Sequence, residues 1–162
     1  MVTHFFKPLA ALAVCFLVVS CAVQPLQIGA SRGQVLAYYG EPTRVVATAT
    51  GSRLQYSRQP AGQSAVMVDL DAADRVVSVR QMLNPAGFAA VVVGESTRQG
   101  LEHMLGRPAS VDRVRAWPGD ILTYRWRDGG GQDMVYWFYL DANQTVQRTG
   151  QAMEFPVRVE ND

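Results

Sequence analysis

Apolar and polar positions along the chain follow two different periods, and the same order of periods occurs twice. Around residues 31–40 and again around 96–106, apolar side chains recur at i, i+3 and i+4, the spacing of one face of a short helix. Each stretch is followed by short runs rich in β-branched and aromatic residues, separated by Gly, Pro and Asp, which indicate strands joined by turns. The sequence therefore predicts two copies of a helix followed by antiparallel strands.

Both predicted helices have marked ends. Capping boxes of the form Ser-x-x-Gln fit residues 31–34 and 96–99, and would satisfy free N–H groups in the first turn. Gly40 and Gly106 stand where a residue with positive φ ends a helix, and a proline follows two residues later. Helices of about two turns are unstable alone, so each is expected to lie on the strands that follow it.

The fold class predicted from this pattern is α+β, with two tandem helix-plus-antiparallel-sheet repeats and the helices on one face of the sheet. A single repeat would bury only a marginal core, so the two are expected to pack side by side and could share a sheet. The expected divisions are a lipoprotein signal peptide (1–20), a tether (21–25), a first repeat (26–84), a linker (85–90), a second repeat (91–155) and a tail (156–162).

The N-terminus has the pattern of a secretory signal. Lys7 precedes an unbroken apolar run at 9–19, which is too short to span a membrane. The run ends in Val18-Val19-Ser20-Cys21, which resembles a bacterial lipobox and makes Cys21 the expected lipidation site and mature N-terminus. Two or more acyl chains would anchor the protein stably, and Ala22 favours the periplasmic face of the outer membrane. The alternative is an ordinary signal peptide with an incidental cysteine.

Composition argues against several classes of partner. The mature chain would carry no cysteine besides Cys21, which excludes a disulfide or a thiolate metal site within it. The formal net charge is +1, so no nucleic-acid partner is expected. The acyl anchor, rather than a basic surface, would hold the protein on the membrane.

Two turns are predicted from residue type. Asp69-x-Asp71-x-x-Asp74 could suggest a calcium loop, but the second copy loses two of the three acids, which favours a turn in which Asp71 accepts backbone N–H groups. Trp117-Pro118-Gly119-Asp120 fits a type II turn with Gly119 at the third position.

Catalytic chemistry is not indicated. His103 is the only histidine of the mature chain and lies off the apolar stripe of its helix, so no Ser-His-Asp arrangement and no His/Cys/carboxylate metal cluster can be assembled. The Gly-rich stretch 129–131 precedes a strand rather than a helix, so it is not a phosphate loop. We expect neither an enzyme nor a bound cofactor, metal or small-molecule substrate.

Strand alternation identifies a candidate binding face. Leu122, Tyr124 and Trp126 share one side of their strand, which we assign to the core. The opposite face would then carry Arg125, Arg127, Trp137 and Tyr139, a composition typical of protein-binding hot spots. Two alternatives are that Arg stems cover the rings by cation–π contact, or that the other repeat buries this face.

The repeated pattern resembles the SmpA/OmlA (BamE-like) family of outer-membrane lipoproteins. The matching residues are Gly29, Ser31, Val35, Gly40, Pro42, Tyr56, Leu70 and Asp71 in the first copy, and Gly94, Ser96, Leu101, Gly106, Pro108, Tyr124, Leu140 and Asp141 in the second. Members of that family have a single repeat, and a tandem resembles the β-lactamase-inhibitor-protein-like fold, in which the concave sheet face binds a partner enzyme.

The resemblance implies a non-catalytic, outer-membrane-anchored periplasmic lipoprotein that acts as a binding or scaffold module in outer-membrane or envelope assembly. Its expected partner is a periplasmic or outer-membrane protein. The alternative function is an inhibitor or sensor that binds a periplasmic enzyme through the open sheet face.

Overall fold

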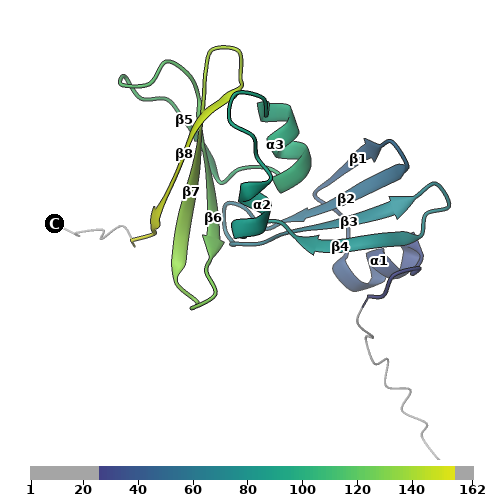
Figure 1. Cartoon of the computed structure of the whole chain (residues 1–162). Coiled ribbons are helices and arrows are strands. Elements are labelled where there is room, and N and C mark those ends of the chain that lie inside the picture. The colour runs from purple at the N-terminus through teal and green to yellow at the C-terminus, as the bar shows by residue number, and fades with distance from the viewer. Residues whose placement is uncertain (1–25, 156–162) are drawn as a thin grey trace, which may run out of the picture.

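The structure is a computed structural model that describes residues 26–155; the predictions for the signal peptide, Cys21 and the tail lie outside the described residues. Among residues 26–155, no helix is long and apolar enough to cross a membrane. The elements, drawn in Figure 1, are α1 (Arg32–Tyr39), β1 (Arg44–Thr48), β2 (Gly51–Ser57), β3 (Ala65–Asp71), β4 (Val76–Gln81), α2 (Pro85–Ala89), α3 (Arg98–Leu105), β5 (Ser110–Asp112), β6 (Ile121–Arg127), β7 (Asp133–Leu140) and β8 (Val146–Met153).

The strands form two separate antiparallel sheets, β1-β2-β3-β4 and β5-β6-β7-β8, each a simple meander. This confirms the α+β class. A β-bulge interrupts each last strand pair at the equivalent place, after Asp69 in the first sheet and after Tyr139 in the second. Bulges increase local twist, and here both fall beside the Asp turn that joins the third and fourth strands of each sheet.

Both predicted ends of α1 and the predicted end of α3 at Gly106 are confirmed, whereas the start of α3 is shifted by one residue. At α1, the Ser31 N–H donates to Gln34 Oε1 (2.8 Å) while the Gln34 N–H donates to the Ser31 hydroxyl oxygen (3.3 Å). At α3 the cap is Thr97, whose hydroxyl oxygen accepts the Gly100 N–H (3.2 Å), and the predicted box at 96–99 is wrong. The closing glycines fix this register, because Ser31 and Thr97 both lie nine residues before them.

The Asp turn is confirmed in both halves. Asp71 Oδ1 accepts the backbone N–H groups of residues 73 and 75, and Asp141 Oδ1 accepts those of residues 143 and 145, all at 2.9 Å. The type II turn at 117–120 is wrong, because Gly119 does not have positive φ. Glycine is required there for another reason: a Cβ on Gly119 would overlap the carbonyl of Leu140.

The layers differ from the expected arrangement, in which both helices lie on one face of the sheet. Leu54, Tyr56, Val68 and Leu70 face α1 and pack on Val35. The opposite face of the first sheet is covered by α3, which also packs on the second sheet. The order is therefore α1, first sheet, α3, second sheet, and Figure 1 shows α3 between the two sheets.

The expected linker at 85–90 contains a short helix that belongs to the core. Asn84 caps α2 by accepting the Gly87 N–H (2.9 Å). The Phe88 ring is 3% exposed, stacks on Tyr136 with centroids 4.2 Å apart, and meets Trp126 edge-on at 5.5 Å. The segment between the sheets is thus fixed to the inner face of the second sheet.

Candidate functional site

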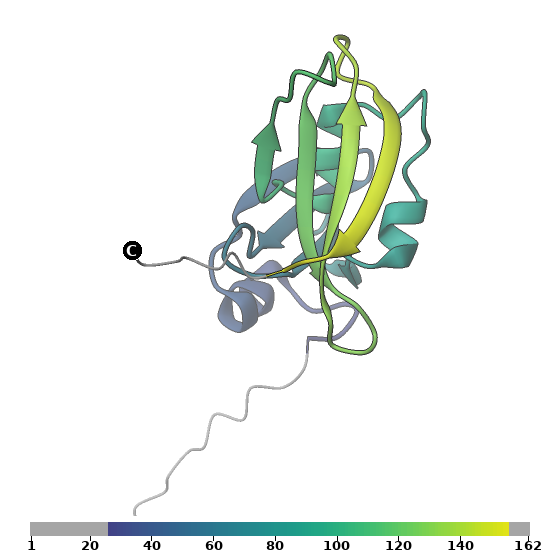
Figure 2. The same ribbon diagram turned by 90° about the vertical axis from the view of Figure 1, so that its left-hand side faces the viewer.

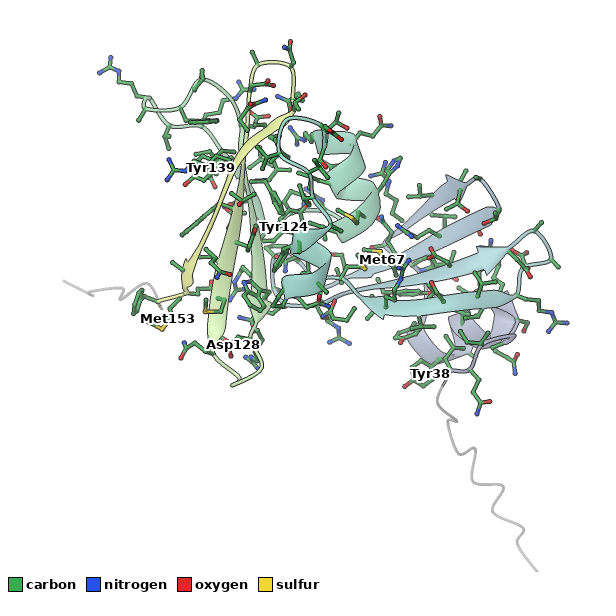
Figure 3. The ribbon with its side chains drawn as sticks, in the orientation of Figure 1. Tyr38, Met67, Tyr124, Asp128, Tyr139 and Met153 are labelled. Atoms are coloured by element: carbon green, nitrogen blue, oxygen red, sulfur yellow. The ribbon has the colours of Figure 1, made fainter. Side chains whose placement is uncertain are left out.

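The outer face of the second sheet is the candidate site. It points away from α3, and Figure 2 looks onto it with no helix or strand in front. Strand pairing places Thr123 opposite Trp137 and Ile121 opposite Tyr139, so the predicted alternation of faces is confirmed. Figure 3 shows Tyr124 directed toward α3 and Tyr139 on the other side of the sheet.

Aromatic rings form the centre of this outer face, which we call the aromatic face and define by Trp117, Ile121, Thr123, Trp137, Tyr139, Arg148 and Gly150. The Trp117 ring meets Tyr139 edge-on with centroids 5.3 Å apart, and its Nε1–H donates to the Leu140 carbonyl (2.6 Å). Gly150 lies beneath the rings of Trp137 and Tyr139, where a Cβ would already be in van der Waals contact with both. The rings thus rest directly on the sheet backbone.

A cation also contacts the Tyr139 ring, but it is neither of the two arginines expected. The Arg148 guanidinium carbon lies 5.2 Å from the centroid of the Tyr139 ring, which is cation–π distance. Trp117 and Arg148 were both missed from the sequence. Extending strand alternation to the last strand would have found Arg148, whereas Trp117 comes from a loop and leaves no periodic pattern.

The two predicted arginines lie on the same side of the sheet but nearer its other end. Arg125 Nε is 2.6 Å from Glu154 Oε1, and its NH1 donates to the Pro60 carbonyl (2.7 Å) in the loop between β2 and β3. Arg127 pairs with Asp133 at 2.8 Å, and its hydrogen bond holds the pKa of that carboxyl below its usual value. Both guanidinium groups already have carboxylate partners, so the rings and Arg148 form the centre of the site.

The equivalent face of the first sheet is not open. Gln55 is 1% exposed and its Nε2 donates to the carbonyls of Glu102 (2.9 Å) and His103 (3.0 Å) near the end of α3. Met67, at the position that corresponds to Trp137, is fully buried between the sheet and α3 (Figure 3). Each sheet packs one face on the helix of its own half. The other face is covered by α3 in the first sheet and is uncovered in the second sheet.

A groove of about 700 Å³ between the halves is a second candidate site. Its charged groups are largely paired with one another: Glu102 lies 3.0 Å from Arg98 and 3.5 Å from Arg44. Arg98 also bonds the buried carboxylate of Asp120 (2.9 Å), whose pKa is lowered by its hydrogen bond from Arg113. This network joins α3 to both sheets, and the groove has few groups left to select a ligand.

The three acids of the possible calcium loop are held apart. Asp69 forms a two-point ion pair with Arg53 (2.6 and 3.0 Å), Asp71 makes the turn, and Asp74 pairs with Arg32 (2.9 Å). Burial acts to raise the pKa of Asp69, but hydrogen bonds from Arg53, Ser78 and Arg80 outweigh it and hold that pKa below its usual value of 3.8. Over residues 26–155, no group of three or more His, Cys, Asp or Glu could hold a metal ion.

Comparison with known proteins gives no family. No family model matches the chain, and no curated protein matches it either. A search of solved structures finds the crystal structure of a DUF4309 family protein (YjgB) from Bacillus subtilis subsp. subtilis strain 168. That likeness covers 76% of this chain and 78% of the other at 19% identity, with a TM-score of 0.33 that carries no argument about fold or function.

The assignment to the SmpA/OmlA family, and with it the β-lactamase-inhibitor-protein-like assignment, is wrong: no family model and no curated protein supports it, and the solved structure that the search finds carries the name of another family. The physical reason is that the matched residues serve local structure. Ser31 caps a helix, Gly40 ends it and accepts the Tyr56 hydroxyl (3.2 Å), and Asp71 closes a turn. Such caps and turns recur in unrelated folds, so they do not identify a family.

Proposed function

We propose that this protein is a non-catalytic binding module of the cell envelope that recognises a protein partner through its aromatic face. The observation that carries the proposal is the contrast between the two sheets. The first sheet buries its outer face under α3, whereas the corresponding face of the second sheet is uncovered and is richer in aromatic side chains.

The chemistry of the aromatic face supports a protein partner. Trp, Tyr and Arg are the residues enriched at the energetic centres of interfaces, and rings held on a rigid sheet lose little side-chain entropy on binding. Trp137 and Tyr139 are half-buried. Both rings lie over Gly150, and Tyr139 also contacts Trp117 and Arg148. A partner with a flat apolar surface and a carboxylate for Arg148 would fit this face.

We further propose that the two halves are repeats of one unit. Backbone bonds recur at offsets of 65 to 70 residues: Gly29 N–H donates to the Val76 carbonyl and Gly94 N–H to the Val146 carbonyl, both at 2.7 Å. The helix-closing glycines are likewise bonded by Tyr hydroxyls from the second strand of each sheet. Repetition explains why the second half presents the same kind of docking face as the first.

The membrane anchor is part of the proposal. Acyl chains on Cys21 would place the module at the periplasmic face of the outer membrane, and the five-residue tether at 21–25 would keep it close to the bilayer. A partner would therefore be an envelope protein within reach of that surface.

Photo-crosslinking in the cells that make the protein tests the binding face. A benzoyl-phenylalanine residue replacing Trp137 or Tyr139 is expected to give an adduct with a specific second protein. Tyr38 on α1 is the matched control, because it is an exposed aromatic residue on another surface of the molecule. Adducts of equal yield from position 38, or none from 137 and 139 in a folded protein, would refute the proposal.

A further inference from the structure

The strand β8 has an outer edge that is only partly used. It is the terminal strand of the second sheet and, at eight residues, the longest of the four edge strands. At its start, the Val146 N–H donates to the Ser96 carbonyl (2.8 Å) and its carbonyl accepts the Gly94 N–H, so the chain itself covers that end. Beyond Val146, no other segment within residues 26–155 hydrogen-bonds this edge.

The antiparallel pattern shows which backbone groups are free. The Glu154 N–H donates to the Asp133 carbonyl (2.8 Å) across the pair of β7 and β8. Because hydrogen-bonded residues alternate along antiparallel strands, Arg148, Gly150 and Ala152 direct their backbone N–H and C=O groups toward β7. Thr149, Gln151 and Met153 therefore direct their N–H and C=O groups away from the sheet. Such an edge is a template for another strand unless it is blocked by Pro, Lys or a covering segment.

The opposite edge of the same sheet shows what such a block looks like. β5 has only three residues, and beside it the side-chain amide of Gln59 takes the place of a missing strand. Gln59 Oε1 accepts the Arg125 N–H (3.2 Å) and its Nε2 donates to the Arg125 carbonyl (2.5 Å). Along β8 the one basic residue is Arg148, which lies over Tyr139 on the outer face rather than over the edge.

A pocket accompanies the free edge. It measures about 380 Å³ and is lined by Pro85, Phe88, Ala89, Tyr136, Thr149, Gly150 and Gln151. In Figure 2, α2 lies alongside β8, so the pocket is a groove between this helix and the strand. None of the lining residues is charged, and the stacked rings of Phe88 and Tyr136 form its apolar wall.

We propose that this groove binds an extended peptide segment of another protein, which adds to β8 as a fifth strand and places an apolar side chain between α2 and the sheet. Directly paired residues of antiparallel strands project to the same face. A partner residue that exchanges both hydrogen bonds with Thr149 would therefore direct its side chain toward Phe88 and Tyr136. Main-chain bonds would supply affinity and the pocket would supply selectivity.

A second copy of this chain fits the groove less well. In a symmetric antiparallel pair of β8 strands centred on the pocket, each copy would place Thr149 or Gln151 against the aromatic wall, burying polar side chains there. The uncharged lining favours an aliphatic or aromatic side chain. The groove lies on the inner side of the sheet and shares only Gly150 with the aromatic face, so the inference stands whether or not the proposed function is correct.

A phage library of random decapeptides, selected against the purified full chain in detergent, tests the inference. Enriched peptides are expected to alternate apolar and polar residues. Thr149→Pro removes one outward N–H without touching the β7 ladder, and should weaken their binding about tenfold. Val79→Pro, the corresponding change in β4, is the matched control and should leave binding unchanged. The Met82 N–H donates to the Ala65 carbonyl, so by the same alternation the Val79 N–H also points away from its sheet, but on a strand outside the groove.

A second pair of variants tests the pocket. Ala89→Trp fills the groove from an exposed position on α2 and should abolish binding, whereas Ala86→Trp, exposed on the same helix but outside the pocket, should not. Three results would overturn the proposal: no enriched peptides, binding indifferent to Thr149→Pro, or a wild-type dimer that Thr149→Pro dissociates. Deleting residues 156–162 should leave the affinity unchanged; a tenfold rise would make that segment the occupant instead.

Discussion

Two tyrosines make the same hydrogen bond in different surroundings, which gives a prediction with a built-in control. The Tyr124 hydroxyl donates to the Gly106 carbonyl (2.9 Å), and both residues are buried. The Tyr56 hydroxyl donates to the Gly40 carbonyl (3.2 Å), but Gly40 is exposed. Burial also raises the pKa of Tyr124, so its hydroxyl remains a donor throughout the pH range in which the protein is studied.

Replacing each tyrosine by phenylalanine removes the hydroxyl and keeps the ring. After Tyr56→Phe, the Gly40 carbonyl can bind water, so the cost should be about 0.5 kcal/mol of unfolding free energy. After Tyr124→Phe, the Gly106 carbonyl loses its partner in a site closed to water, and the desolvation penalty adds to the lost bond. We expect about 2 kcal/mol for that variant.

Urea unfolding followed by tryptophan fluorescence and circular dichroism measures both values. With a slope of about 2 kcal/mol per molar urea, Tyr124→Phe should lower the midpoint by about 1 M and Tyr56→Phe by about 0.3 M. Because α3 packs on both sheets, both variants should move one common transition. Equal losses, or no loss for Tyr124→Phe, would refute the view that burial of the acceptor decides the energy.

Three further predictions concern single residues. Asp69 has a folded pKa below its unfolded value, so the stability it contributes is present above about pH 4 and is lost as pH falls through the folded pKa. Asp69→Asn should therefore flatten the loss of stability that urea titrations show below about pH 4. Gly119→Ala should destabilise by about 3 kcal/mol or more through its clash with the Leu140 carbonyl, whereas Gly129→Ala, which meets nothing within 4 Å, should cost less than about 0.5 kcal/mol by thermal melting. Cys21→Ser should release the protein from membranes on fractionation, and an unchanged distribution would contradict lipid anchoring.

The candidate site was partly predictable because strand alternation is a local property. The face shared by Trp137 and Tyr139 followed from the period of two, since each neighbouring side chain must point the other way. The centre of the site did not follow. Trp117 reaches Tyr139 from a loop, and Arg125 is tied to Glu154 and Pro60, contacts that join residues far apart in the chain.

By itself, the sequence determined the short-range features: two capped helices, two runs of antiparallel strands and the Asp turns, because each depends on bonds within a few residues. Tertiary structure alone decided how the halves stack. Gln55 and Met67 are buried although they point away from the helix of their own half, because α3 of the other half covers them. The outer face of the second sheet and the edge of β8 remain uncovered because no third unit within the described chain packs on them.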